Sequence, residues 1–266
     1  MQNVIIIGSD GFIGSNLAEY CSKKNLNIFR TSRKFNKLKS KVFHFDLKNP
    51  NFEFLNKKID VAIICASVTS VEKCQKNPRN SNKINVTNTL KLIKYLNSKG
   101  VFTIYLSSNL IFNGKLSFNK YNDKPNPLSV YGAQKAKIEK YIKSKKYKNF
   151  SVVRLTKVIG NNSNFIKKLN LKIKKKETIG YEENYLFSPV RIEQVCLIIF
   201  KIVRNKYEGL FQFSGLKEYN LEEFIKLYFK KKVNIKKLNT KKNHWKNYKN
   251  SRKIFLPFKF QFKNHF

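Results

Sequence analysis

Two patterns of apolar and polar positions alternate along the first 160 residues of the chain. Short, continuous apolar runs are separated by segments in which apolar residues recur every three or four positions. The continuous runs are typical of buried parallel strands, and the spaced pattern is typical of amphipathic helices. The expected strands are residues 3–8, 26–30, 42–45, 61–65, 102–106 and 152–155, and the expected helices are residues 12–24, 80–98 and 131–143.

Strands that alternate with helices build βαβ units, so this order predicts an α/β fold. We expect a Rossmann-like, doubly wound parallel sheet with a small C-terminal substrate-binding lobe. The alternation weakens after Gly160, where a lysine-rich helical stretch begins. We expect a dinucleotide-binding domain over residues 1–160, to which residues 188–214 return, and a lobe formed by residues 161–187 and 215–266.

The turn after the first expected strand carries three glycines at fixed spacing. It reads Gly8-Ser-Asp-Gly11-Phe12-Ile13-Gly14 and opens the first expected helix. In this context the first glycine permits a tight turn, the second lets backbone amides approach a pyrophosphate, and the third lets helix and strand pack closely. The pyrophosphate then lies at the positive end of the helix. The loop therefore predicts binding of NAD(H) or NADP(H).

The end of the second expected strand favours NADP(H) over NAD(H). An acidic residue there would bind the ribose 2′-hydroxyl of NAD, but the chain has Ser32, Arg33 and Lys34 instead, which suit a 2′-phosphate. Residues after the third and fourth strands complete the expected cofactor site. We expect Asp46 and Leu47 to meet the adenine, and Cys65, Ala66 and Ser67 to lie beside the ribose and phosphate.

Three residues form a candidate catalytic group. Tyr131 and Lys135 are four positions apart, hence on one face of a helix, and Ser108 ends the fifth expected strand. A neighbouring ammonium ion and the positive charge of an oxidised nicotinamide both favour the phenolate, so we expect Lys135 and the nucleotide together to bring the pKa of Tyr131 toward the working pH. The hydroxyl of Ser108 would hydrogen-bond the oxygen whose charge changes. Tyr131 and Lys135 would also contact the cofactor.

The net charge is strongly positive, but its composition favours a simple interpretation. The 266 residues include 55 Lys and Arg against 16 Asp and Glu, a formal net charge of +39, and only seven of the basic residues are arginines. Nucleic-acid readers depend on arginine for bidentate contacts. The lysines accompany abundant Asn, Ile, Phe and Tyr, the set that a drift toward A and T in the coding sequence would enrich. We expect a solvated lysine surface that favours a polyanionic substrate, and no specific nucleic-acid partner.

Cysteine, histidine and hydropathy patterns complete the expectations. The four cysteines (Cys21, Cys65, Cys74 and Cys196) form no CxxC pair, and no histidine lies near them at metal-ligand spacing. We therefore expect reduced thiols, no metal site and a cytoplasmic protein. We also expect no signal peptide, because the first strand begins almost at Met1, and no membrane span, because the longest apolar runs are too short for one.

The glycine loop with Ser108, Tyr131 and Lys135 resembles the extended short-chain dehydrogenase/reductase family, the NAD-dependent epimerase/dehydratase group. Most of the chain takes part in the resemblance, and residues 106–114 and 127–132 are most similar to the dTDP-4-dehydrorhamnose reductase subgroup. The resemblance implies that Ser108 is the catalytic hydroxyl, that Asn85 is a structural or water-positioning helper, and that Asn164 and Phe165 bind substrate. A homodimer through the long helices is common in that family.

One departure from the family pattern narrows the chemistry. Sugar-nucleotide dehydratases carry an Asp-Glu pair directly after the catalytic hydroxyl, whereas this chain has Asn109 and Leu110. We therefore predict a nucleotide-sugar reductase that delivers a hydride to a 4-keto sugar nucleotide, with Tyr131 as general acid. The alternatives are a nucleotide-sugar epimerase, a non-catalytic NADP-binding regulatory relative, and a nucleic-acid-binding protein, whose binding would fall steeply with salt.

Overall fold

Seven parallel strands form the central sheet of the protein. The computed structural model describes residues 1–37, 40–116, 119–230 and 233–238. The order across the sheet is β10-β6-β5-β4-β1-β2-β3, and every neighbouring pair is parallel. These strands are β1 (Asn3–Ile7), β2 (Asn27–Ser32), β3 (Val42–His44), β4 (Val61–Ile64), β5 (Phe102–Ser108), β6 (Phe150–Leu155) and β10 (Gly209–Phe213).

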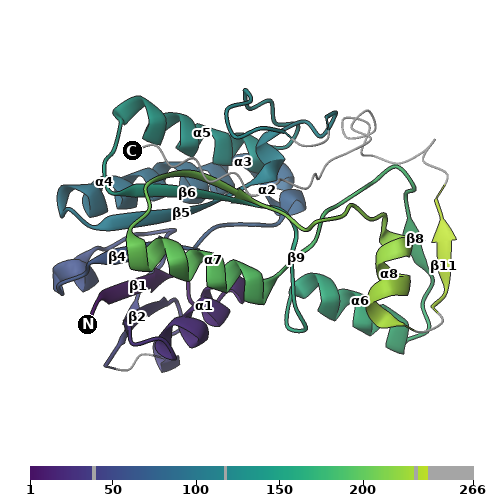
Figure 1. Cartoon of the computed structure of the whole chain (residues 1–266), viewed down its shortest axis with the longest axis horizontal. Helices are drawn as coiled ribbons and strands as arrows, with labels where there is room; N and C mark the ends of the chain where they lie inside the picture. Colours follow the sequence, from purple (N-terminus) through teal and green to yellow (C-terminus); the bar gives the residue numbers. More distant parts are fainter. Residues whose placement is uncertain (38–39, 117–118, 231–232, 239–266) are drawn as a thin grey trace.

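Helices cover both faces of this sheet (Figure 1). One face carries α1 (Phe12–Ser22) and α7 (Ile192–Asn205), and the other carries α2 (Val71–Lys76), α3 (Pro78–Asn82), the π-helical turn η3 (Lys83–Asn88), α4 (Thr89–Ser98) and α5 (Val130–Lys145). Because a strand covered on both faces buries every side chain, β1, β4 and β5 are continuously apolar or small. The predicted doubly wound Rossmann-like fold is confirmed.

A smaller lobe packs around its own apolar core at one end of the sheet (Figure 1). It contains α6 (Asn164–Lys174), β8 (Ile179–Tyr181), α8 (Leu221–Phe229) and β11 (Ile235–Lys237), and β8 pairs with β11. The short strands β7 (Val158–Ile159) and β9 (Val190–Arg191) pair where the chain passes between the sheet and the lobe. The part of the expected lobe beyond residue 238 lies outside the described residues.

One expected helix is divided into three parts. The sequence predicts a single helix over residues 80–98, but the chain forms α3, then η3, then α4. A π-helical turn accommodates an extra residue and is common at functional sites. Here it buries Asn85 and Asn88 against the loops that follow β4 and β3.

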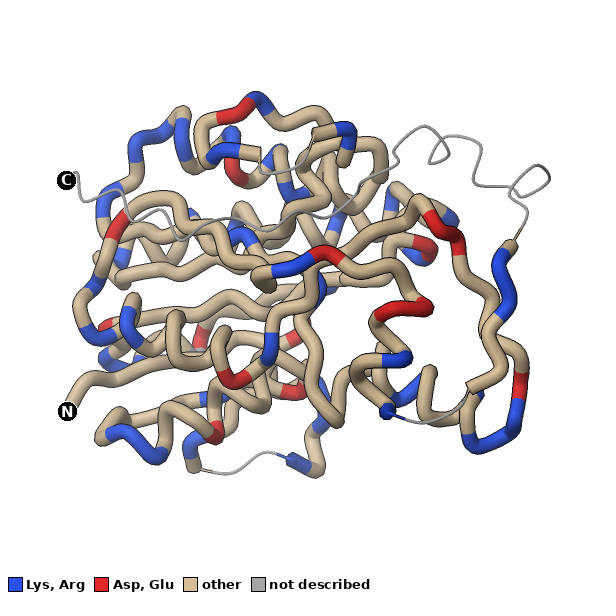
Figure 2. The backbone as a smooth tube through the Cα atoms, turned by 45° about the vertical axis from the view of Figure 1, so that its right-hand side comes forward, with Lys and Arg blue, Asp and Glu red and all other residues tan. Residues whose placement is uncertain are grey.

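Several helices end on a lysine where glycine is the usual residue. Lys146, Lys206 and Lys230 follow α5, α7 and α8, and all three adopt the left-handed conformation with φ between 46° and 49°. Glycine has no Cβ and adopts this conformation without the steric cost that other residues incur. Elsewhere, Lys and Arg are distributed over helices and loops of both the sheet domain and the lobe (Figure 2).

The first turn of α5 is packed too closely for any side chain at Gly132. A Cβ there would lie 2.1 Å from the carbonyl oxygen of Leu110, which belongs to the short helix η4 (Asn109–Ile111). A glycine-to-alanine change inside a helix ordinarily stabilises by about 1 kcal/mol. We expect the opposite sign for Gly132→Ala, a loss of about 1–3 kcal/mol in the free energy of unfolding, measured by urea denaturation. A higher denaturation midpoint would contradict the close contact.

Candidate active site

The predicted site residues lie at one edge of the sheet, where the parallel strands end. Gly8 follows β1, Ser32 ends β2, Cys65 follows β4 and Ser108 ends β5. Open parallel sheets bind ligands at this carboxyl edge. Residues that are far apart in the sequence therefore reach a common site because their strands share one direction.

The glycine loop forms a close-packed cradle at the start of α1. Gly8 has a φ of +88°, and a Cβ there would lie 2.7 Å from the backbone of Ala66. A Cβ at Gly14 would lie 2.5 Å from the carbonyl oxygen of Gly8. Gly11 is the N-cap of α1 and supplies no side chain to the amides of the first turn, which begins at Phe12 and Ile13. No side chain caps this helix end, and no side chain of the three glycines blocks the approach to its amides. It therefore fits a dinucleotide pyrophosphate.

A carboxylate that the sequence analysis missed lies at the end of β2. The side chain of Asp10, from the glycine loop, accepts a 2.7 Å hydrogen bond from Ser32 and a 3.4 Å one from Lys37. Burial opposes ionisation of Asp10, but these hydrogen bonds outweigh it and lower the pKa of the carboxyl below its usual value. Arg33 and Lys34 are exposed beside it. The strand end therefore presents a negative group from the preceding loop as well as the predicted basic groups.

The remaining predicted cofactor residues border the same region. The carboxylate of Asp46 accepts from the amide of Lys48 at 2.9 Å and shapes the turn after β3, while Leu47 is buried. The amides of Cys65 and Ala66 both donate to the carbonyl of Ile7, which fixes the loop after β4 beside the glycine cradle. Burial raises the pKa of the Cys65 thiol to about 12, so it is not an activated nucleophile.

Asn85 connects this loop to α5. Its Oδ1 accepts from the hydroxyl of Ser67 at 2.9 Å and from the amide of Val68 at 2.8 Å. Its Nδ2 donates to the carbonyl of Val68 at 3.0 Å and to Gln134 at 2.8 Å. These bonds use the full capacity of the amide, so the arrangement favours a structural role for Asn85 over water positioning.

Tyr131 and Lys135 lie one turn apart on α5 and face the sheet. The helix begins cleanly because the Ser129 hydroxyl accepts from the Gly132 amide at 3.0 Å. Lys135 Nζ donates to the carbonyl of Leu106 in β5 at 2.8 Å and lies 5.6 Å from the centre of the Tyr131 ring. Tyr131 as a whole residue is 8% exposed, and no described residue hydrogen-bonds its hydroxyl. That hydroxyl is therefore available to a substrate oxygen.

Ser108 also faces this site, at the end of β5. Its Oγ accepts from the amide of Leu110 at 3.2 Å and lies 3.4 Å from the side-chain oxygen of Asn109. The residue is 9% exposed, so its hydroxyl is held at a fixed point of the sheet edge. Asn109 is buried directly beside it.

Burial controls the protonation of the two helix residues. It raises the pKa of the Tyr131 phenol well above its usual range. It lowers the pKa of the Lys135 ammonium to about 8, against the opposing effect of the Glu139 carboxylate. The predicted lowering of the Tyr131 pKa, which also needs the positive charge of an oxidised nicotinamide, stays a prediction. A protonated Tyr131 near neutral pH suits a proton donor.

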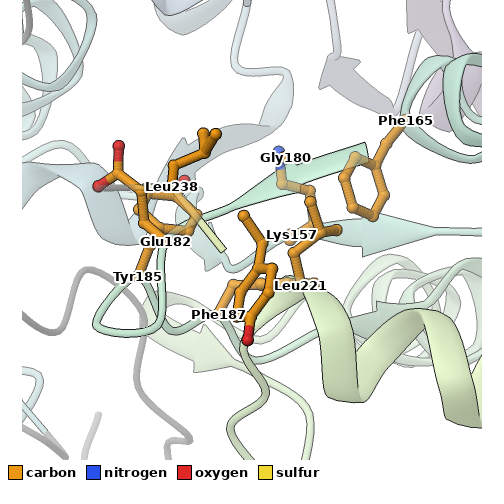
Figure 3. A pocket seen from close by; sticks show the side chains of 9 residues that line it. Lys157, Phe165, Gly180, Glu182, Tyr185, Phe187, Leu221 and Leu238 are labelled. Carbon is orange, nitrogen blue, oxygen red and sulfur yellow. The ribbon is translucent and has the colours of Figure 1, made fainter. Parts of the chain in front are cut away.

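An aromatic pocket of about 250 Å³ lies in the lobe (Figure 3). Lys157 and Phe165 lie on one side of it, with the Lys157 Nζ 5.2 Å from the Phe165 ring centre, and Glu182 lies on the opposite side. Lys157 forms no ion pair with any described residue, and burial lowers the pKa of its ammonium group. Of the two predicted substrate residues, Phe165 lines this pocket, whereas Asn164 begins α6 and is exposed.

The described residues lack both a metal-binding cluster and a membrane-spanning helix. They contain no cluster of three or more His, Cys, Asp and Glu side chains able to hold a metal ion. Within the same ranges, no helix combines the length and the apolar character needed to cross a bilayer.

Comparisons with known proteins give three informative matches. The chain is 28% identical over 149 residues to methionine adenosyltransferase 2 subunit beta of Bos taurus, covering 53% of this chain and 42% of that protein. It is 24% identical over 196 residues to dTDP-4-dehydrorhamnose reductase of Salmonella typhimurium, covering 72% and 64%. The fold matches the dTDP-4-dehydrorhamnose reductase of Bacillus anthracis in complex with NADP, with a TM-score of 0.83, 21% identity, and coverage of 98% and 91%. The alignments thus span less than two thirds of both sequence relatives.

The sheet, the glycine cradle and the Ser108-Tyr131-Lys135 group define a protein of the extended short-chain dehydrogenase/reductase type. Residues 1–250 match the family model described as RmlD substrate binding domain. The chain belongs to this family.

Asp10 generates a prediction about the choice of nucleotide. Its carboxylate would repel a 2′-phosphate bound at the end of β2 and would accept a hydrogen bond from a 2′-hydroxyl. We expect Asp10→Asn to raise the affinity for NADPH relative to NADH by roughly tenfold, about 1.4 kcal/mol, measured by fluorescence titration of both nucleotides. Glu19→Gln, on the exposed face of α1, is the matched control. An unchanged ratio would exclude Asp10 from nucleotide selection.

Proposed function

We propose that this protein is an NADP(H)-favouring sugar-nucleotide reductase that reduces a 4-keto group to an alcohol. The proposal is supported by Tyr131 and Lys135, which are buried one turn apart on α5, by the hydrogen bond of Lys135 to Leu106, two residues before Ser108 in β5, and by the glycine cradle at the same edge of the sheet. Family membership and a neighbouring fold solved with NADP support the same assignment. The four free cysteines suit a reducing, cytoplasmic setting.

The nucleotide, when bound, supplies the hydride, and the residues of the chain control the oxygen of the substrate. Gly8, Gly11 and Gly14 would hold the pyrophosphate. Ser108 would orient the carbonyl by donating a hydrogen bond to its oxygen. Tyr131 would transfer its proton to this oxygen as negative charge develops, and the adjacent Lys135 would stabilise the resulting phenolate. The side chains of Asn109 and Leu110 offer no acid or base for dehydration.

The charges around the nucleotide site favour NADP(H), but the expected preference in affinity over NAD(H) is smaller than the sequence alone predicts. Arg33 and Lys34 are exposed at the end of β2 and would attract a 2′-phosphate. Asp10 opposes them from the glycine loop. We therefore propose that NADP(H) is the preferred nucleotide and that NAD(H) is also accepted.

The pocket beside Lys157 is our proposed site for the sugar nucleotide. Lys157 lies two residues after β6, whose last residue, Leu155, pairs with Ser108, so this side of the pocket lies near the candidate catalytic group. A half-buried ammonium without an ionic partner among the described residues is suited to an anionic group such as a diphosphate. The aromatic side chains of Phe165 and Tyr185 would pack against the rings of the ligand.

The similarity to methionine adenosyltransferase 2 subunit beta favours a second candidate function. That relative is named as a subunit of a different enzyme, so this chain could serve as a nucleotide-binding partner rather than as a reductase. The two functions predict different results with substrate. A reductase consumes NADPH when a 4-keto sugar nucleotide is added, and a subunit of this kind binds the nucleotide without turnover.

An epimerase remains the alternative within the same chemistry. It would oxidise the sugar first, retain the nucleotide tightly and return the hydride to the other face. It would therefore interconvert two sugar nucleotides without net consumption of NADPH. Product analysis of the same reactions separates this outcome from reduction.

Tyr131→Phe tests the reductase directly. We expect NADPH consumption with a panel of 4-keto sugar nucleotides to fall by about 10²–10⁴-fold, because the proton donor is lost, while NADPH binding is retained. Tyr141→Phe, on the same helix, is the control and should keep the rate of the unsubstituted protein. Absence of turnover by the unsubstituted protein on the whole panel would support the subunit function instead.

Lys157→Met tests the pocket. We expect the KM for the sugar nucleotide to rise roughly tenfold, equivalent to about 1.4 kcal/mol, while the KM for NADPH is unchanged, because the lost charge lies in the lobe. Lys172→Met, an exposed lysine of α6, is the matched control. Equal KM values for the two variants would remove Lys157 from the substrate site.

A further inference from the structure

A buried ion pair lies one helical turn beyond Lys135. Glu139 of α5 and Arg154 of β6 have side chains that are 8% and 4% exposed. Arg154 Nε lies 3.1 and 3.0 Å from the two carboxylate oxygens of Glu139, and Arg154 Nη2 lies 2.6 Å from Oε2. This geometry, with two nitrogens against one carboxylate, is among the strongest that a buried pair adopts.

The pair also connects several other elements. The hydroxyl of Ser107 in β5 donates to the Glu139 carboxylate. Arg154 Nη1 donates to the side-chain oxygen of Gln212 in β10 at 2.8 Å and to the carbonyl of Tyr121 at 3.0 Å. Gln212 in turn donates to the carbonyl of Asn119 at 3.3 Å. The segment 119–121 lies on the connection between Ser108 and Tyr131, so the network attaches this connection to the sheet.

Lys135 faces a defined set of ionisable neighbours. The ring of Tyr105 in β5 lies 4.6 Å from its Nζ, and the ring of Tyr131 lies 5.6 Å away. The thiols of Cys65, after β4, and of Cys74, in α2, face it from the other elements. Burial raises the pKa of both thiols, so they stay neutral near pH 7. Glu139 lies four residues along α5, on the same side of the helix: Lys135 Nζ donates to the carbonyl of Leu106 at 2.8 Å, and the hydroxyl of the next residue, Ser107, donates to the Glu139 carboxylate. Its negative charge therefore acts on the Lys135 ammonium.

We infer that Glu139 and Arg154 are positioning residues of the active site: Glu139 keeps Lys135 in its ammonium form, and Arg154 sets how strongly it does so. The inference rests on the proposed hydride transfer and deepens it, because Lys135 stabilises the Tyr131 phenolate only while it is charged. The carboxylate is shared between two cations. Arg154 holds it rigidly and neutralises part of its charge, and the remainder acts on Lys135.

This division of charge predicts shifts of opposite sign for two substitutions. Glu139→Gln removes the attraction and leaves Arg154 as an uncompensated like charge, so Lys135 loses its proton at lower pH. Arg154→Met leaves the carboxylate to Lys135 alone, so Lys135 keeps its proton to higher pH. An opposite charge within about 4–6 Å of an ionisable group moves its pKa by about 1 unit or more. A purely structural pair would weaken folding in both variants without any opposed shift.

The experiment is the pH dependence of two quantities, kcat/KM for 4-keto reduction and the affinity for NADPH measured by calorimetry, from about pH 6 to pH 10. We expect the alkaline decline of both to move down by about 1 pH unit in Glu139→Gln and up by about 1 in Arg154→Met. Glu72→Gln, from an exposed i,i+4 pair with Lys76, is the matched control and should leave the profile unchanged.

The outcomes separate this inference from the proposed function. Shifts of the same sign, or none, in the affinity profile would overturn the role of the pair. If the unsubstituted protein reduces no sugar nucleotide, the proposed function fails, but the affinity profile still decides the inference. Because loss of one partner of a buried pair weakens folding, each variant is first checked by thermal unfolding. Where only one variant folds, the direction in which its alkaline decline of NADPH affinity moves decides whether the pair has the inferred role.

Discussion

The shared direction of the seven strands is the constraint on which the rest of the site depends. Parallel pairing brings the ends of β1, β2, β4 and β5 to one edge, so the glycine cradle, Ser32, Cys65 and Ser108 meet without any long-range loop. At that edge Gly8 packs directly against the backbone of Ala66. This packing fixes the glycine loop against the loop after β4. Asn85, which is bonded to the loop after β4, also hydrogen-bonds Gln134 and so fixes α5 relative to both loops.

Much of this architecture could be predicted from the sequence, because its signals are local. Continuous apolar runs indicate strands that are buried on both faces, and the glycine spacing indicates the cradle. What the sequence could not predict depends on tertiary neighbours. The carboxylate of Asp10 reaches the end of β2 only after the glycine loop has folded back toward that strand. The raised pKa of Tyr131 and the lowered pKa of Lys135 come from burial, which no spacing of residues along the chain reveals.

Charge has different effects at the surface and in the interior of this protein. Most of the lysines in the described residues are exposed, so their charges are screened by solvent and salt. Among the described residues, the charged side chains that are buried are Lys135, Arg154 and Glu139, and they lie on α5 and on the strand β6. Interactions in this setting are stronger because the surroundings are less polarisable than water. The electrostatics of the proposed reaction are therefore local, and the overall net charge is a poor guide to them.

The lysines that end α5, α7 and α8 extend this picture to the backbone. Left-handed residues other than glycine cost on the order of 1 kcal/mol each, so three helix ends of this protein carry backbone strain. Glycine at Lys146, Lys206 or Lys230 would relieve this strain without touching the site. The helix termini therefore offer a way to stabilise the protein that is independent of its chemistry.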